Sequence, residues 1–313
     1  MTRNITFILL SYNNATTILE ALDCAFRQTH HSLDIVVSDD CSTDGSFALI
    51  KRRIARDRGP HNVRAVRNSS NLGIVGNINA AVAHAQGDLL VIAAGDDRSH
   101  PERVTLLVER WEAAGSPTAC VLYSDVTPID SAGRPVEGWS ERVARPPWTL
   151  ERLAEGKTGP LGAGCAITRR LLTEPTPISP SVVHEDRVFA FRARLLGGEV
   201  LFIDHELVQY RIHGGISRLA SANKMTELTT AAKTRLGRVI ADARQRLADA
   251  RSARAPKRII ERCRQVVAEQ EAMLAMASGK QILTHALEAV RGDARASRMA
   301  MHLLRFARAR FFQ

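Results

Sequence analysis

Short apolar runs alternate with amphipathic stretches between Ile5 and Ser124, and this alternation constrains the fold more than any other feature. Runs typical of buried strands cover residues 5–10, 34–38, 63–67, 89–94 and 119–124. Stretches with helical periodicity lie between them, over residues 15–27, 46–57, 77–85 and 101–114. Strands that alternate with helices pair in parallel, because each helix carries the chain back across the sheet. We therefore predict an α/β fold with a doubly wound, mainly parallel sheet.

The pattern changes after Ser124. The run DSAG at 130–133 predicts a hairpin turn, a helix is expected over 186–196, and strands are expected over 200–203 and 207–212. From residue 220 onward the chain is rich in Ala, Arg, Leu and Glu, which indicates two or three helices. We therefore divide the chain into an α/β unit over 1–219, with halves 1–115 and 116–219, and a helical C-terminal extension over 220–313.

The composition indicates a folded cytoplasmic protein. Of the 313 residues 45% are hydrophobic, which supports a packed core, and the apolar run at 89–94 is far too short to span a bilayer. The five cysteines show no C-x-x-C spacing, which argues against a disulfide framework or a zinc site. The N-terminal segment lacks the pattern of a cleaved secretory signal. Peripheral contact with the inner face of the membrane is a further option.

The net charge of +10 is concentrated in the C-terminal extension. Over residues 295–313, Arg side chains are interleaved with Met, Leu and Phe. A basic helix of this kind suits an anionic membrane surface. The same pattern is typical of a helix packed on the α/β unit with its arginines in solvent, and both interpretations stay open. Self-association into a homo-oligomer is another option, whereas no motif points to nucleic acid as a partner.

Polar residues follow four successive strands of the expected sheet. They form the segments Ser11-Tyr12-Asn13, Asp39-Asp40, 68–73 and Gly95-Asp96-Asp97. In open α/β sheets, ligands bind at the carboxyl ends of the strands. One such loop would be read as ordinary turn residues. Four polar loops at the same edge of the sheet favour a ligand-binding site.

The runs SYNNATTILEALDCAFRQTHHSLDIVVSDDCSTDGS and NSSNLGIVGNINAAVAHAQGDLLVIAAGDD resemble family 2 glycosyltransferases of the GT-A fold, over roughly residues 5–217. The resemblance implies transfer, with inversion, of one sugar from a UDP- or dTDP-sugar to a hydroxyl of a glycan, lipid-linked or protein acceptor. It places the chain in surface glycan or polysaccharide biosynthesis. Residues 1–115 would bind the nucleotide and 116–219 the acceptor. The Q-x-x-R-W motif of processive members is not found, so transfer of single sugars is expected.

The pair Asp96-Asp97 is the candidate metal site. The resemblance assigns Mn²⁺ or Mg²⁺ to Asp97 and gives Asp96 contact with the ribose or a share of the metal. Such an ion neutralises a leaving diphosphate and often takes only one or two protein carboxylates. Many relatives carry another acid two positions earlier, where this chain has Ala94. The alternative is an exposed turn that caps the next helix.

The donor would be bound by residues at the other strand ends. By resemblance, Asp40 accepts a hydrogen bond from the ring N–H of the base, and Ser11, Tyr12 and Asn13 flank it. Asn71 and Gly73 stand where relatives approach the diphosphate or ribose, although a plain turn before a helix is an equal alternative.

The acids Glu185 and Asp186 open the helix expected over 186–196. By resemblance Asp186 is the general base and Glu185 supports it; the alternative is first-turn acids favoured by the helix dipole. The ending Tyr210-Arg211-Ile212-His213 resembles a family motif. His213 would complete the metal site or hold the diphosphate, and Arg211 would hold the diphosphate or pair with an acid in the core. The glycine-rich loop 159–165 lines the acceptor site in relatives, without an assignable residue.

Two other function classes stay open. A nucleotidyltransferase shares the α/β scaffold and the metal, but a Gly-rich phosphate loop is expected after its first strand, and residues 11–14 do not form one. A non-catalytic sugar-nucleotide-binding or scaffold protein would keep the GT-A fold without turnover. Ala94 leaves room for that class.

Overall fold

The computed structural model describes residues 4–137, 143–212 and 225–277. The last of these ranges begins with α8, the first described helix of the C-terminal extension. The strands are β1 (Ile5–Ser11), β2 (Asp34–Asp39), β3 (Asn62–Arg67), β4 (Leu89–Ala94), β5 (Arg98–Ser99), β6 (Cys120–Ile129), β7 (Ala166–Thr168) and β8 (Glu199–Arg211). The helices are α1 (Ile18–Phe26), α2 (Ser46–Ala55), α3 (Gly73–Val82), α4 (Arg103–Ala113), α5 (Leu150–Glu155), the 3-10 turn η1 (Gly162–Gly164), α6 (Arg170–Thr173), α7 (Glu185–Leu195), α8 (Met225–Ser252) and α9 (Lys257–Ala277).

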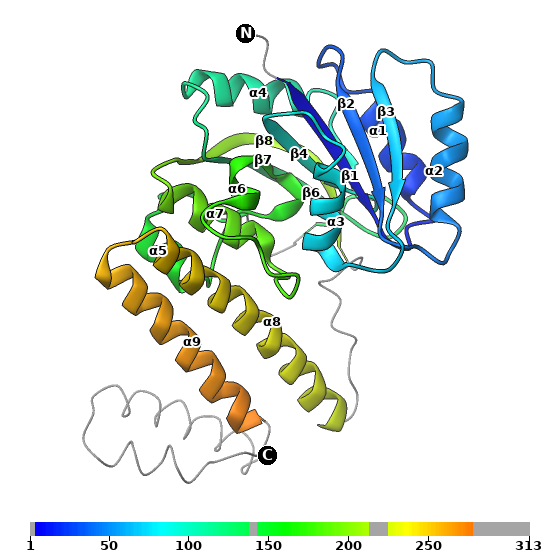
Figure 1. Ribbon diagram of the computed structural model, residues 1–313. Coiled ribbons are helices and arrows are strands. Elements are labelled where there is room, and N and C mark those ends of the chain that lie inside the picture. The colour runs from blue at the N-terminus through cyan, green and yellow to red at the C-terminus, as the bar shows by residue number, and fades with distance from the viewer. Residues whose placement is uncertain (1–3, 138–142, 213–224, 278–313) are drawn as a thin grey trace, which may run out of the picture.

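All described strands belong to one sheet with the order β3-β2-β1-β4-β7-β6-β8-β5 (Figure 1). Strands β1 to β4 pair in parallel, as do β6 and β8. The short β7 runs antiparallel between β4 and β6, and β5 runs antiparallel to β8. The α/β fold and its mainly parallel sheet are therefore confirmed, with two short antiparallel strands added.

Helices cover both faces of the sheet, because alternate side chains of a strand point to opposite faces. In β1, Phe7 and Leu9 pack with α1 and α4, whereas Ile8 and Leu10 pack with α3 and α7. Both sets are almost fully buried. The helices on the two faces do not cover the carboxyl ends of β1, β2 and β4, which form an open end of the sheet.

The end of the α/β unit differs from the prediction. The two strands expected over 200–203 and 207–212 are one strand, β8, which pairs with β6 along its length. The register shifts where β6 passes from Ser124 to Asp125, so the exposed Asp204 and His205 form a bulge inside the strand before Glu206 pairs with Asp125. In the sequence the polar run at 204–206 predicts a break between two separate strands. The hairpin turn at 130–133 is confirmed, since Gly133 N donates to Asp130 O over 3.0 Å.

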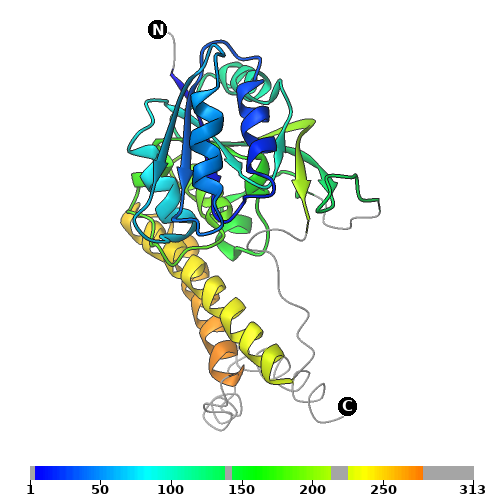
Figure 2. The same cartoon turned by 90° about the vertical axis from the view of Figure 1, so that its right-hand side faces the viewer.

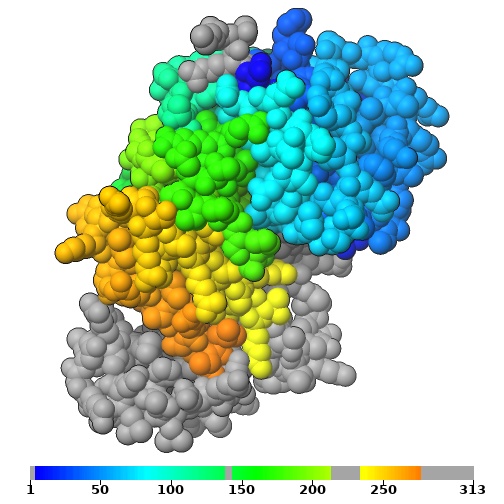
Figure 3. Space-filling model, in the orientation of Figure 1, coloured from blue at the N-terminus to red at the C-terminus, as the bar shows by residue number. Residues whose placement is uncertain are grey.

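Helices α8 and α9 lie side by side and pack against the second half of the α/β unit (Figures 1, 2). The space-filling view shows them, in yellow and orange, continuous with the green surface of that half (Figure 3). Arg192 of α7 and Asp249 of α8 form a fully buried ion pair of 2.8 Å at this junction. The proposed boundary at 219/220 and the basic segment 295–313 lie outside the described residues. Among the helices that are described, none is both long and apolar enough to cross a membrane.

Candidate active site

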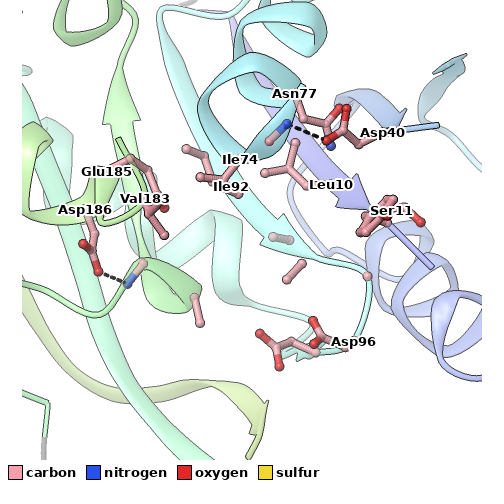
Figure 4. Close-up of a pocket in the computed structure, with 18 of the residues that line it drawn as sticks. Leu10, Ser11, Asp40, Ile74, Asn77, Ile92, Asp96, Val183, Glu185 and Asp186 are labelled. Carbon is pink, nitrogen blue, oxygen red and sulfur yellow. Dashed lines mark hydrogen bonds between the residues drawn. The ribbon is translucent and has the colours of Figure 1, made fainter. Parts of the chain in front are cut away.

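A cavity of about 630 Å³ opens at the carboxyl ends of β1, β2 and β4. It is also lined by η1, by the start of α7 and by Arg238 of α8. Figure 4 shows Glu185 and Asp186 on one side, Asp40 and Ser11 on the other, and Asp96 below them. The sequence-predicted residues that line the cavity are Ser11, Tyr12, Asp40, Asn71, Gly73, Asp96, Asp97, Glu185, Asp186 and Arg211.

The turn after β4 carries Asp96 and Asp97 into the cavity. Asp97 is only 6% exposed, and burial together with the charge of Asp96 raises its pKa to about 8. Burial also raises the pKa of Asp96. Two adjacent carboxyls that resist ionisation fit a divalent cation, whose charge favours their anionic form. In the described part of the chain no group of three or more His, Cys, Asp or Glu side chains is arranged so that it could hold a metal ion, so the site would rest on this pair and on donor phosphates.

Arg211 fixes this turn from the end of β8. Its backbone N–H donates to Asp97 Oδ1 over 2.8 Å, and its Nε donates to Asp96 O over 2.8 Å. The remaining guanidinium nitrogens bond the carbonyls of Asp130 and Ser131 and Glu20 Oε2. The guanidinium is therefore engaged by protein groups, including an acid of α1. Contact between Arg211 and a diphosphate stays a prediction.

Asp40 organises the turn that begins α3. Its Oδ1 accepts hydrogen bonds of 2.8 Å from Asn68 Nδ2 and Leu72 N, and its Oδ2 accepts one of 2.9 Å from Gly73 N. Gly73 has a φ of +72°, a conformation that glycine adopts without strain. Oδ2 keeps a lone pair for a further donor in the cavity. Asp40 is thus built into the cavity wall, and recognition of a base there stays a prediction.

The β1–α1 loop forms the neighbouring wall. The hydroxyl of Ser11 is buried and has no hydrogen-bond partner in the described chain, which is unusual for a buried polar atom and leaves it able to bond a molecule in the cavity. Tyr12 is 48% exposed at the rim. Asn13 is not among the lining residues; its Oδ1 accepts from Thr43 N over 2.9 Å and ties this loop to the next. Its neighbour Asn14 lines the cavity instead.

The first turn of α7 presents Glu185 and Asp186 to the cavity. Asp186 Oδ1 accepts from Arg187 N over 2.7 Å, and its Oδ2 accepts from Gly162 N over 3.1 Å. Burial by surrounding protein and the charge of Asp186 raise the pKa of Glu185 to about 8, and burial raises the pKa of Asp186. A Cβ on Gly162 would lie 3.3 Å from Glu185 Oε1. The glycine-rich loop thus contributes Gly162, which sequence reasoning left unassigned.

Three further polar lining residues were not assigned from the sequence. Asn77 of α3 bonds Ser38 Oγ and Asn68, His184 precedes the acid pair, and Arg238 comes from α8. The signal for His184 was its place beside Glu185. No local pattern distinguishes Arg238 from the other arginines of the extension. His213, the third expected metal ligand, lies outside the described residues.

A sequence model described as glycosyl transferase family 2 matches residues 6–171, more than half of the chain. The chain belongs to this family. Succinoglycan biosynthesis protein ExoO of Rhizobium meliloti is 35% identical over 145 residues, which are 46% of this chain and 39% of that protein. An uncharacterized glycosyltransferase of Nostoc sp. is 26% identical over 232 residues, 71% of this chain and 69% of its own. This chain therefore spans less than half the length of the first relative.

Solved structures confirm the GT-A fold. Mannosyltransferase PcManGT from Pyrobaculum calidifontis, in complex with GDP-Man and Mn²⁺, matches with a TM-score of 0.57 over 98% of this chain and 81% of its own, at 20% identity. Residues 1–349 of TarS from S. aureus, in complex with UDP-GlcNAc, match with a TM-score of 0.53 over 89% of this chain and 93% of their own, at 14% identity. The predicted family and fold class are both confirmed.

Proposed function

We propose that this protein transfers one glycosyl residue, with inversion, from a nucleotide-diphosphate sugar to an acceptor hydroxyl. One observation carries the proposal: two carboxyl pairs, Asp96-Asp97 and Glu185-Asp186, line the same cavity from different elements. Inversion by direct displacement needs a charge-neutralising site for the leaving group and a base on the other face of the sugar. The two pairs supply both groups.

The donor half is formed by the strand ends. Asp97, with Asp96, would hold Mn²⁺ or Mg²⁺, which when bound neutralises charge on the leaving diphosphate. Asp40 Oδ2 and the unpartnered hydroxyl of Ser11 would bind the nucleoside, and Tyr12 would cover it at the rim. Asn71 and Gly73 lie beside Asp40 and would approach the ribose or diphosphate. A UDP- or dTDP-type base suits a carboxylate acceptor, because both bases carry a ring N–H.

Asp186 is the base of the acceptor half. Glu185 and Asp186 repel one another, so near neutral pH the pair holds a proton. The backbone N–H groups of Gly162 and Arg187 both donate to Asp186, and such bonds favour its ionised form. We assign the proton of the pair to Glu185, whose pKa is raised by burial and by the charge of Asp186. Asp186 accepts the proton of the attacking hydroxyl, and Glu185 supports it.

The pathway assignment is part of the same proposal. ExoO carries a name from succinoglycan biosynthesis, and this likeness favours a glycan acceptor in surface polysaccharide assembly. We place the reaction in the cytoplasm, where nucleotide sugars are made. Contact of the C-terminal extension with the inner membrane face would bring a lipid-linked acceptor to the site.

Product analysis with a donor panel tests this function. The full chain is mixed with UDP-glucose, UDP-GlcNAc, dTDP-rhamnose or GDP-mannose and Mn²⁺, and thermal shift and released products are measured. We expect one donor to stabilise the protein and to release a nucleoside diphosphate slowly, with water as acceptor. Release of pyrophosphate from a nucleoside triphosphate and a sugar phosphate would indicate a nucleotidyltransferase instead. Stabilisation without turnover, even with added glycan acceptors, would indicate the non-catalytic class.

A further inference from the structure

Helix α8 lies outside the segment 6–171 that defines the family, yet it contacts the residues just before the candidate base. Asp242 of α8 is 2% exposed. Its Oδ2 lies 2.5 Å from His184 Nδ1, and its Oδ1 accepts from Val183 N over 3.1 Å and from His184 N over 3.4 Å. One buried carboxylate therefore binds both the ring and the backbone of the residue that precedes Glu185.

The same face of α8 binds the rest of the loop that leads to α7. Gln245 Oε1 accepts from Ser179 N over 2.8 Å, and Asp249 bonds Thr176 and Arg192. Positions 242, 245 and 249 follow the spacing of one helical face. Arg238, one turn before Asp242 on this face, lines the cavity together with His184. The helix is thus part of the wall of the candidate site.

The contact with Asp242 decides how His184 can bond inside the cavity. An ionised carboxylate only accepts hydrogen bonds, so Nδ1 must carry the hydrogen. In a neutral ring Nε2 then has no hydrogen and accepts hydrogen bonds. Nε2 has no hydrogen-bond partner in the described part of the chain, while His184 lines the cavity beside the acid pair. It is therefore open to a hydroxyl of a bound molecule.

We propose that His184 binds the acceptor through Nε2, at a hydroxyl near the one that reacts, and that Asp242 is the positioning residue that sets the ring and its tautomer. The assignment rests on the proposed function. It makes α8 an integral part of the acceptor half, so an extension outside the family segment helps to choose the acceptor. The group that His184 would bind is a hydroxyl of the acceptor sugar, which donates its hydrogen to Nε2.

The variant Asp242→Asn separates the ring contact from the backbone contact. Asparagine keeps an oxygen for the amides of Val183 and His184, but its NH₂ group donates to Nδ1 and moves the ring hydrogen to Nε2. Asp242→Ala removes both contacts. Arg244→Gln is the matched control, because Arg244 lies on the same helix and bonds Glu271 of α9 instead.

The tautomer is measured on the full ¹⁵N-labelled chain by long-range ¹H–¹⁵N correlation of histidine rings, with His184→Gln identifying the signal. We expect the Nδ1–H form in the wild type and in Arg244→Gln, and the Nε2–H form in Asp242→Asn. If His184 carries its hydrogen on Nε2 in the wild type, or if its tautomer is the same in Asp242→Asn as in the wild type, Asp242 does not have the positioning role. This result does not depend on any enzymatic activity.

Transfer is measured with the donor selected by the panel and with methyl glucoside, galactoside and mannoside as acceptor probes. We expect Asp242→Asn to lower the transfer rate about 10–100-fold, with an unchanged thermal shift by UDP and Mn²⁺. His184→Ala should lower the transfer rate by the same factor. The double variant should be no slower than either single variant, because the two residues act as a unit. Wild-type rates in Asp242→Asn, or additive losses, overturn the acceptor role. A wild type without any turnover overturns the proposed function and this role with it, whereas the tautomer still decides the positioning.

Discussion

The backbone N–H of Arg211 donates a 2.8 Å hydrogen bond to Asp97 Oδ1, although the two residues are 114 positions apart. The guanidinium of Arg211 bonds the carbonyl of Asp96 as well. The last strand of the α/β unit therefore fixes the acid pair that follows β4. Because the bond from Arg211 N needs only an oxygen at the Oδ1 position, replacement of Asp97 by asparagine should remove the charge without moving the turn.

Asp97→Asn should abolish metal-dependent turnover while the fold is kept. The substitution removes a charge that a divalent ion would need, and we expect a loss of more than about a hundredfold in donor turnover. Circular dichroism should be unchanged, and the melting temperature without metal should be equal or higher, because asparagine removes the cost of holding a proton on Asp97 that the unfolded chain releases. Asp204→Asn, on an exposed carboxyl, is the control. Full turnover of the wild type in EDTA would remove the metal role.

Stability without metal should fall as pH rises from about 5 to about 8. The folded-state pKa values of Asp97 and Glu185 are about 8, above their ordinary values near 4. The contribution of these two carboxyls to the free energy of unfolding is fully present below their pKa values in the unfolded chain. It is lost as pH rises toward and through the folded-state pKa values, because in that range the folded state holds protons that the unfolded state has released. Melting temperatures in EDTA measure this, and Glu185→Gln should show a shallower fall. Glu174→Gln, on an exposed ion pair, should keep the wild-type slope.

Added Mg²⁺ should stabilise the protein more at pH 8 than at pH 6. The ion binds the ionised carboxyl pair, so its binding competes with protons on Asp96 and Asp97. The difference in melting temperature with and without Mg²⁺ reports this competition. A shift of equal size at both pH values would place the ion elsewhere.

Asp186→Asn should stop transfer but not donor binding. Loss of a general base costs about a hundredfold or more in rate, whereas asparagine keeps an oxygen for one of the two amides that bond Asp186, those of Gly162 and Arg187. Glu151→Gln, in the first turn of α5, is the matched control for a helix-terminal acid. Single-turnover rates and the thermal shift by UDP and Mn²⁺ give the two readouts. An unchanged rate would transfer the role to Glu185 or to another group.

Asp40→Ala should weaken nucleotide binding and also destabilise the protein. One charge-assisted hydrogen bond contributes about 1.5–3 kcal/mol, which corresponds to about one to two decades in affinity. The alanine also leaves Leu72 N without its acceptor, at a cost of about 1–3 kcal/mol, whereas Asn68 Nδ2 and Gly73 N keep Asn77 and Asn71 as acceptors. Titration calorimetry with UDP and urea unfolding separate the two effects. Wild-type affinity combined with lower stability would show that Asp40 only organises the turn.

The sequence by itself determined the features whose signal is local. The strand and helix periods between Ile5 and Ser124 predicted the α/β layers, because burial of one face depends on neighbours a few positions away. The acids Asp96 and Asp97, and the acids Glu185 and Asp186, were recognisable as adjacent pairs at the ends of elements. The place of Asp96 and Asp97 at the ligand-binding edge followed from the rule that ligands gather at the carboxyl ends of parallel strands, whereas Glu185 and Asp186, at the start of a helix, were assigned by resemblance to the family.

Only the tertiary structure decided which distant groups meet. The contact of Asp242 with His184 joins residues 58 positions apart, and that of Arg211 with Glu20 joins residues 191 positions apart. Such contacts depend on how whole helices and strands pack, and a local pattern carries no record of them. The same holds for the pKa values of Asp97 and Glu185, which are raised mainly because packing removes water from around their carboxyl groups; the second charge comes from the adjacent residue of each pair.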